Sequence, residues 1–425
     1  MIEVLVVVGP GVVADAGLLE EIAAREFAAA GVSGALVHAR DASHVLSLLS
    51  SPSPSSPSPS PSSSSPPNGA GCVVVLPGPS AEVRSLIRRD LGAVVWVDVE
   101  RADGVTAGEG ATHLHGRGIG GLAWGIRHAV HRVRHPSRRI AYGPLPEQWG
   151  ELYLPDADEP PVVMLIHGGY WRSIWAADIM GPLCADLVGR GLAVWNLEYR
   201  RPDLHGWDAT TADVAAGLTV LATASEVRGL AVLATASGSD ALPPGADRRP
   251  GTVAALDLAR VAVVGHSAGA QLALRAVADA AAGEVNAASG VGVVMAVSLA
   301  GVLDLVEGDR RWVGTGAVGA ALGGRAPGLG EGRAAPPYAD ASPLLRLPLR
   351  VRQLIVQGAA DDLDLIDFSR RYARAAERAG DDVTYLEMPG DHFDVINPAT
   401  PIWQATAEAI AHVLPPPQGD KTDNN

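Results

Sequence analysis

The sequence predicts an α/β protein of two domains, each built from a sheet covered by helices. In both halves of the chain, short β-branched apolar runs alternate with longer segments of helical periodicity. At 425 residues the chain exceeds one ordinary domain, and its 47% hydrophobic residues supply apolar surface for two cores. A basic stretch around Pro136 separates the two halves. We therefore expect one domain over residues 1–134 and a second over residues 135–415.

Strand-like and helix-like segments alternate along most of the first half. Its strands are expected at residues 2–8, 34–38, 72–76, 93–98 and 111–115, and its helices at 18–30, 42–49, 81–91 and 122–133. This alternation predicts a five-stranded parallel sheet with helices on both faces. Residues 50–70 are mostly Ser and Pro, a composition that buries little apolar surface, so we expect a disordered insertion within a loop.

The second half repeats the α/β pattern on a larger scale. Its strands are expected at residues 162–166, 193–198, 261–265, 293–299, 353–357 and 383–388. Residues 217–225 are nearly repeated as 229–237, an offset of twelve that is not a whole number of helical turns. We expect one copy to complete a helix and a loop insertion to occupy residues 223–252. The polar residues 416–425 are expected to be a disordered tail.

Composition excludes several classes of partner. The formal net charge is −14 and Lys421 is the only lysine, which argues against nucleic acid, because phosphate binding needs a basic surface. No apolar run reaches the length of a membrane span. Residues 1–8 carry Glu3 and lack a basic leader, so they predict a strand rather than a signal peptide. We expect a cytoplasmic protein that acts on a small molecule, and homo-oligomerisation stays open.

The most informative motif is Gly265-His266-Ser267-Ala268-Gly269. It lies between a strand-like run and an alanine-rich helical pattern, the context in which G-x-S-x-G forms the nucleophile elbow of an α/β-hydrolase. Small residues at both ends allow the sharp turn that presents the serine oxygen. Ser267 is therefore the candidate nucleophile.

A serine needs a histidine as its base and a carboxylate to orient that histidine. In this fold the chain order is Ser, then Asp or Glu, then His. Asp361 follows the strand expected at 353–357, and His392 follows the next one, so both lie where such sheets bind ligands. Asp362 and Asp364 are alternatives for the acid.

The tetrahedral intermediate also requires hydrogen-bond donors for its oxyanion. His167-Gly168-Gly169 follows the strand expected at 162–166 and matches the H-G-G loop of esterases. We assign the donors to Gly168 and Gly169, together with the N–H of Ala268 from the elbow. His167 is expected to hold the loop.

Residues 142–415 resemble the serine-hydrolase kynurenine formamidases (arylformamidases) of the α/β-hydrolase superfamily. The resemblance lies in residues 142–148, 167–171, 265–271 and 391–396. It implies metal-independent cleavage of N-formylkynurenine to kynurenine and formate, with Tyr170, Trp171 and Phe393 beside an aromatic substrate. Packing in the core is an equal alternative for these three. A broad-specificity carboxylesterase is the alternative activity, and a catalytically inactive ligand-binding or scaffold protein is the alternative of another class.

Residues 1–134 are faintly similar to type II 3-dehydroquinate dehydratase, whose flavodoxin-like five-stranded layout they share. The similarity covers residues 5–10, 76–78, 94–97 and 116–121. The dehydratase chemistry does not carry over, because the loop over residues 9–17 has neither the asparagines nor the tyrosine of that family. Asp98 also stands where its histidine is expected. We expect a degenerate domain retained for structure, assembly or ligand binding.

Two further patterns do not indicate a dinucleotide site or a metal site. The glycine motif at residues 116–121 fits G-x-G-x-x-G, but it precedes the last helix rather than the first, so a dinucleotide is not expected. His128, His131 and His135 share a helix face with interleaved arginines, which favours a cationic helix end over metal ligation. We expect no cofactor and no metal.

Overall fold

The computed structural model describes residues 2–50, 72–226, 255–282, 290–326 and 337–415. The Ser/Pro insertion expected at residues 50–70 lies outside these ranges except for residue 50. The loop insertion expected at 223–252 lies outside them except for residues 223–226, and the tail at 416–425 lies outside them entirely. By its internal contacts the chain divides into two compact units. Unit 1 comprises Met1–Pro136 and Ser173–Gly181, and unit 2 comprises Ser137–Arg172 and Pro182–Asn425.

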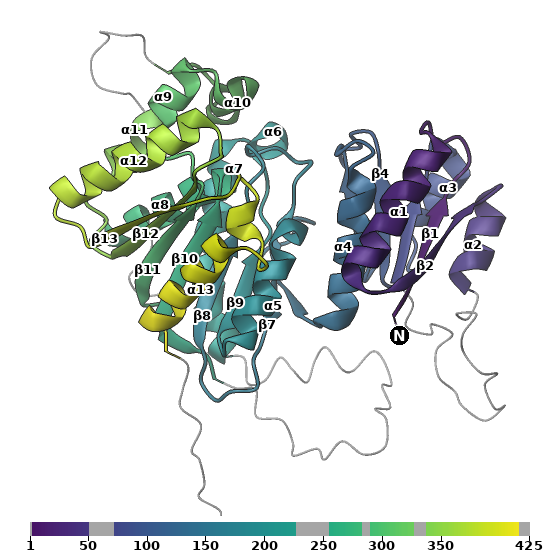
Figure 1. Cartoon of the computed structure of the whole chain (residues 1–425), viewed down its shortest axis with the longest axis horizontal. Helices are drawn as coiled ribbons and strands as arrows, with labels where there is room; N and C mark the ends of the chain where they lie inside the picture. The colour runs from purple at the N-terminus through teal and green to yellow at the C-terminus, as the bar shows by residue number, and fades with distance from the viewer. Residues whose placement is uncertain (1, 51–71, 227–254, 283–289, 327–336, 416–425) are drawn as a thin grey trace, which may run out of the picture. The chain divides into compact units, whose positions relative to one another are not determined.

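Unit 1 contains a five-stranded parallel sheet in the order β2-β1-β3-β4-β5 (Figure 1). The strands are β1 (Glu3–Val8), β2 (Ser33–His38), β3 (Cys72–Leu76), β4 (Val94–Asp98) and β5 (Thr112–His115). The helices are α1 (Ala16–Ala30), α2 (Ala42–Ser50), α3 (Ala81–Ser85), the 3-10 turn η1 (Leu86–Arg88) and α4 (Gly121–Arg134). This strand order is that of the flavodoxin-like doubly wound sheets, which confirms the predicted fold of this unit.

The strands β1, β3 and β4 of unit 1 are largely buried on both faces, as is typical of parallel sheets covered by helices. Alternate strand residues such as Val6 and Val74 pack under α1 and α4, whereas Val7, Val75 and Trp96 face α2, α3 and η1. Because side chains alternate along a strand, the central strands contribute residues to both helical layers.

Unit 2 contains an eight-stranded, mostly parallel sheet in the order β13-β12-β11-β10-β8-β9-β7-β6. Its strands are β6 (Arg138–Ala141), β7 (Trp149–Tyr153), β8 (Pro161–Ile166), β9 (Ala193–Leu197), β10 (Asp257–His266), β11 (Val293–Leu299), β12 (Arg352–Gly358) and β13 (Val383–Met388). The central strand β10 lies between β8 and β11, and residues 261–266 of its C-terminal half are buried. This is the arrangement that the α/β-hydrolase prediction requires.

The sequence did not predict the antiparallel strands β6 and β7. Neither has the β-branched apolar run that marked the central strands, because they lie at one end of the sheet. Arg138 and Arg139, which we assigned to a basic domain boundary, form the start of the edge strand β6. Exposed charged residues suit an edge strand, since they discourage pairing with another chain.

Helices cover the large sheet (Figure 1). They include α5 (Gly181–Gly189), α7 (Trp207–Glu226), α8 (Ala268–Ala281), α12 (Leu363–Arg378) and α13 (Pro401–Val413). The first copy of the duplicated segment lies in α7, and the second copy lies outside the described residues. None of the described helices is both long and apolar enough to cross a membrane.

Candidate active site

Ser267 lies at a sharp turn between β10 and α8. Its φ of 56° and ψ of −120° are strained for a residue with a side chain, and such strain is typical of functional sites. At Gly265 an added Cβ would collide with the backbone of Gly269, and at Gly269 with that of Ile166. The turn therefore requires glycine at both positions, which is the physical content of the G-x-S-x-G motif.

Asp361 and His392 are joined by a hydrogen bond. The Nδ1–H of His392 donates to Oδ2 of Asp361 at 2.9 Å. Burial raises the pKa of Asp361, but the hydrogen bonds from His392, the Asp362 N–H and Gln357 outweigh it, so the net pKa is below the ordinary value. The carboxylate is thus ionised at neutral pH, and it leaves the Nε2 of His392 with a free electron pair.

The two alternative acids are engaged elsewhere. Asp362 caps α12, where its Oδ1 accepts the N–H of Asp364 at 2.8 Å. Asp364 forms an ion pair with Arg311 at 2.9 Å. Of the three carboxylates, only that of Asp361 contacts His392 among the described residues. The geometry therefore favours Asp361 as the acid that orients the histidine.

His266 connects the elbow to the histidine loop. Its Nε2–H donates to the carbonyl oxygen of His392 at 3.0 Å, and the two ring centroids lie 4.7 Å apart. Burial and the neighbouring His392 lower the pKa of His266 to about 3, so its ring is neutral. In the described part of the chain the Ser267 hydroxyl makes no hydrogen bond to His392. Catalytic contacts of this kind are often long before substrate binds.

The glycine loop after β8 lies directly against the elbow. A Cβ added at Gly168 would be 2.6 Å from the carbonyl oxygen of His266 and 2.8 Å from Cβ of Ser267. Ala268 is the first residue of α8, and the first N–H groups of a helix have no intrahelical acceptor. Gly168 therefore lies against Ser267, and Ala268 follows Ser267 at the start of α8.

His167 fixes the base of this loop. It is 0% exposed and stacks on Tyr199 with ring centroids 4.5 Å apart. The Tyr199 hydroxyl donates to the carbonyl oxygen of His167 at 2.8 Å. This placement agrees with the structural role expected from the sequence.

The three aromatic residues assigned to the substrate lie in different surroundings. Trp171 is 2% exposed in the core, and its Nε1–H donates to Gln271 at 3.0 Å, so this residue packs rather than faces a substrate. Phe393 is 43% exposed and lies edge-on to His392 at 5.6 Å. Tyr170 is partly buried, and burial together with the Asp362 and Asp361 carboxylates raises its pKa.

Gln357 is a site residue that sequence reasoning missed. It is the penultimate residue of β12. Its Nε2–H donates to Oδ2 of Asp361 at 2.9 Å, while its Oε1 accepts a hydrogen bond from the Ser369 hydroxyl at 2.8 Å. A glutamine at the end of an apolar strand was the available signal. Such a glutamine does not indicate which residues it contacts, because its hydrogen-bond partners lie outside its own strand.

In unit 1, Asp98 is buried and paired with two basic side chains. Its carboxylate accepts both terminal nitrogens of Arg84 at 2.6 and 2.9 Å and Nε2 of His113 at 2.8 Å. Within the described ranges, no group of three or more His, Cys, Asp or Glu residues is arranged to hold a metal ion.

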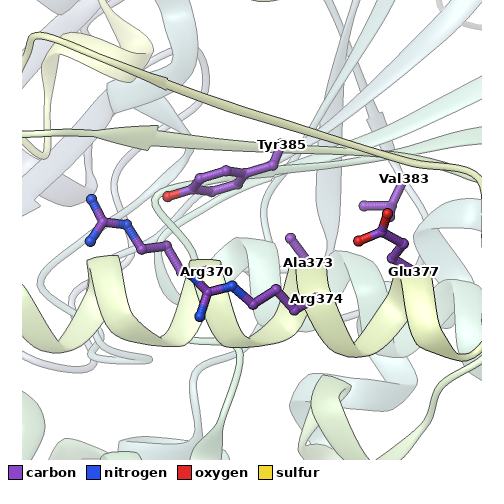
Figure 2. Close-up of a pocket in the computed structure, with 6 residues that line it drawn as sticks. All are labelled: Arg370, Ala373, Arg374, Glu377, Val383 and Tyr385. Atoms are coloured by element: carbon purple, nitrogen blue, oxygen red, sulfur yellow. The ribbon is translucent and has the colours of Figure 1, made fainter.

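A surface hollow of about 330 Å³ lies between α12 and β13, at the other end of β13 from His392 (Figure 2). It is lined by Arg370, Ala373, Arg374, Glu377, Val383 and Tyr385. Arg370 is already paired with Glu387 at 2.8 Å. Because the hollow contains none of the candidate catalytic residues, we do not assign the substrate to it.

The fold of unit 2 and the arrangement of elbow, histidine and carboxylate define the class of α/β-fold hydrolases. Residues 163–396, more than half of the chain, match the family described as the alpha/beta hydrolase fold, and the chain belongs to this family.

Solved structures of similar fold include esterases. Esterase LipW of Mycobacterium marinum is 21% identical with a TM-score of 0.50, and the match covers 68% of this chain and 84% of that one. A bacterial heroin esterase is 21% identical with a TM-score of 0.48, covering 65% and 83%. Carboxyl esterase 2 of the fungus Tuber melanosporum is 16% identical with a TM-score of 0.48, covering 66% and 87%. No curated protein matches the chain.

Proposed function

We propose that unit 2 is a metal-independent serine hydrolase that cleaves a small acyl or formyl ester or amide. The observation that carries this proposal is the hydrogen bond of 2.9 Å between His392 and Asp361 beside the strained Ser267 elbow. The hydrolase family of the chain supports the reaction class. The fold likeness to an esterase adds no substrate by itself.

Each residue has one role in the proposed reaction. Ser267 Oγ attacks the carbonyl carbon while Nε2 of His392 takes its proton, and Asp361 stabilises the resulting imidazolium. The N–H groups of Gly169, Gly168 and Ala268 stabilise the oxyanion. His392 then protonates the leaving alcohol or amine, and a water molecule releases the acid from the serine.

For the substrate we propose an arylformamide, with N-formylkynurenine as the specific candidate. The support is the sequence resemblance together with the half-exposed Phe393 beside His392, which offers an aromatic surface next to the reacting groups. A broad-specificity carboxylesterase is the second candidate, because the glycine loop and the triad suit ester and formamide equally.

One experiment separates the candidates. The purified chain is assayed with N-formylkynurenine and with p-nitrophenyl acetate, and in parallel it is labelled with a fluorophosphonate probe. We expect labelling at Ser267 that Ser267→Ala abolishes, and rates that do not change after exhaustive chelation. Faster kcat/KM on the formamide supports the arylformamidase, and the reverse supports the esterase.

Phe393→Ala extends the test to the substrate. If Phe393 contacts an aromatic leaving group, the variant should raise KM for the formamide several-fold and leave labelling by a small fluorophosphonate within twofold. A wild-type chain that neither reacts with the probe nor turns over either substrate would support the inactive-scaffold alternative.

A further inference from the structure

Trp171 and Gln271 are the last residues of two sequence motifs in unit 2. Trp171 ends the glycine-loop motif at residues 167–171, and Gln271 ends the elbow motif at residues 265–271. The proposed roles of nucleophile, base, acid and oxyanion donor use neither side chain. Both residues are buried, Trp171 at 2% and Gln271 at 0% exposure, and buried polar atoms require hydrogen-bond partners.

A chain of two hydrogen bonds passes through the amide of Gln271. Its Oε1 accepts from the Nε1–H of Trp171 at 3.0 Å. Its Nε2–H donates at 2.8 Å to the carbonyl oxygen of Ala341, the last residue of α11 (Tyr338–Ala341). An indole nitrogen only donates and a carbonyl oxygen only accepts, so the side chain between them needs one acceptor and one donor. The amide of glutamine supplies both, and its two partners fix its orientation.

Gln271 also belongs to the helix that begins at the nucleophile elbow. It lies four residues after Ser267, just over one turn along α8. At the start of the same helix, a Cβ added at Gly269 would be 2.4 Å from the carbonyl oxygen of His167. Helix α8 therefore contacts the glycine loop at its first residue, through Gly269, and at its last residue, Trp171, through Gln271. The two glycines proposed as oxyanion donors lie between these contacts.

The end of the glycine loop is under backbone strain. Tyr170 and Trp171 have φ values of 51° and 55°, a region that costs residues with a side chain about 1–3 kcal/mol each. Such a conformation persists only where surrounding contacts hold it. Arg172 donates a partly exposed hydrogen bond to the carbonyl oxygen of Gly314 at 3.0 Å. The buried hydrogen bond from Trp171 to Gln271 differs from it, because it ends on the helix that carries the nucleophile.

We propose that Gln271 is a positioning residue for hydrolysis, which holds the indole of Trp171 and thereby fixes the glycine loop against Ser267. This inference rests on the proposed serine-hydrolase function. Trp171, which the sequence resemblance placed beside the substrate, then acts on the placement of the oxyanion donors instead of on the substrate.

The test uses the full-length chain and Gln271→Met, which keeps the length of the side chain and removes both hydrogen bonds. A misplacement of about 1 Å in an active site costs on the order of 10²-fold in rate. We therefore expect kcat for p-nitrophenyl acetate and the rate of fluorophosphonate labelling to fall about 10- to 100-fold. KM should stay within about twofold, because Gln271 is fully buried. A raised KM with an unchanged kcat would overturn the proposal, since it would indicate a role in substrate binding.

Gln353→Met is the matched control. Gln353 is equally buried and also has two side-chain partners, Tyr372 and Asp381, but it lies on β12. Both substitutions should lower the urea midpoint, and only Gln271→Met should lower kcat. An equal loss of kcat in both variants would show a general effect of lost core hydrogen bonds and would overturn the proposal.

A double mutant tests whether Gln271 acts through the glycine loop. In a Gly168→Ala background, where a proposed oxyanion donor is already displaced, Gln271→Met should cost less than threefold more in kcat. Fully multiplicative effects of the two substitutions would overturn the proposal, because they would show that Gln271 acts independently of the loop.

Two further outcomes separate the positioning role from the proposed function. A wild-type chain that does not label at Ser267 refutes the proposed function and the positioning role with it. A labelled wild type matched in kcat by a folded Gln271→Met refutes the positioning role alone. If Gln271→Met does not give the circular dichroism spectrum of the wild type, Trp171→Phe decides, because it keeps a buried aromatic ring and removes the N–H donor. We expect kcat to fall about tenfold in that variant, and a wild-type kcat would overturn the proposal.

Discussion

Gln357 donates a hydrogen bond to the same carboxylate oxygen of Asp361 that accepts from His392, at 2.9 Å in both cases. The amide and the imidazole thus share one oxygen of the carboxylate. Ser369 in turn holds the amide oxygen of Gln357, so α12 supports the acid through two hydrogen bonds in series.

Gln357→Met should lower kcat about tenfold or more, because a hydrogen bond to a charged group contributes about 1.5–3 kcal/mol. Gln353→Met is the matched control. Gln353 lies on the same strand and is equally buried, but its partners are Tyr372 and Asp381. The control should lower the urea midpoint and leave kcat unchanged. Equal loss of kcat in both variants would contradict the role of Gln357.

Asp361→Asn should lower kcat by about 10³- to 10⁴-fold, because the amide does not stabilise the imidazolium and favours the wrong tautomer of His392. Asp362→Asn should leave kcat within a few-fold. Asparagine also caps helices well, so the unfolding free energy should change by less than about 1 kcal/mol. Steady-state kinetics with p-nitrophenyl acetate measure both kcat values. A larger loss of kcat in Asp362→Asn than in Asp361→Asn would assign the acid to Asp362.

Gly168→Ala should lower kcat about 10²- to 10³-fold while the protein remains folded, because the added methyl displaces the oxyanion donors. The structural reason is the 2.6 Å approach of that Cβ to the carbonyl oxygen of His266. Gly189→Ala is the control, since a Cβ there meets nothing within 4 Å. Wild-type turnover in Gly168→Ala would remove this residue from the oxyanion hole.

His266 should make the stability of unit 2 depend on pH. Its pKa is about 3 in the folded protein and about 6.5 when unfolded, so between these values the unfolded state binds more protons. The unfolding free energy should therefore fall as the pH drops below about 6.5, by about 2 kcal/mol at pH 5 relative to neutral pH.

Urea unfolding at pH 7.5 and pH 5, followed by tryptophan fluorescence, measures the slope of the unfolding free energy against pH. His266→Gln should flatten it, and His412→Gln, which changes an exposed side chain on α13, should not. An unchanged slope in His266→Gln would show that other groups carry the pH dependence. His131 of unit 1, whose pKa burial also lowers to about 3, is the first such candidate.

Much of the fold was predictable because its signals are local. The strands of unit 1 and the central strands of unit 2 are contiguous apolar runs, and the observed bounds differ from the expected ones by few residues. The exceptions were β6 and β7, whose pairing partners rather than their composition make them strands. The signal for the nucleophile elbow was equally local, because five consecutive residues contain the small side chains that the turn requires.

The sequence by itself determined the class of protein, the order of the candidate nucleophile, acid and base, and the position of the glycine loop, since each depends on residues adjacent in the chain. Only the tertiary structure showed that Asp361 rather than Asp362 contacts His392, that Trp171 lies in the core and that Gln357 donates a hydrogen bond to Asp361. It alone joined residues 173–181 to Arg117. The physical reason is that hydrogen bonds and burial depend on distance in space. His392 and Asp361 are 31 positions apart and Arg117 and Asp178 are 61 apart, and no local pattern encodes either contact.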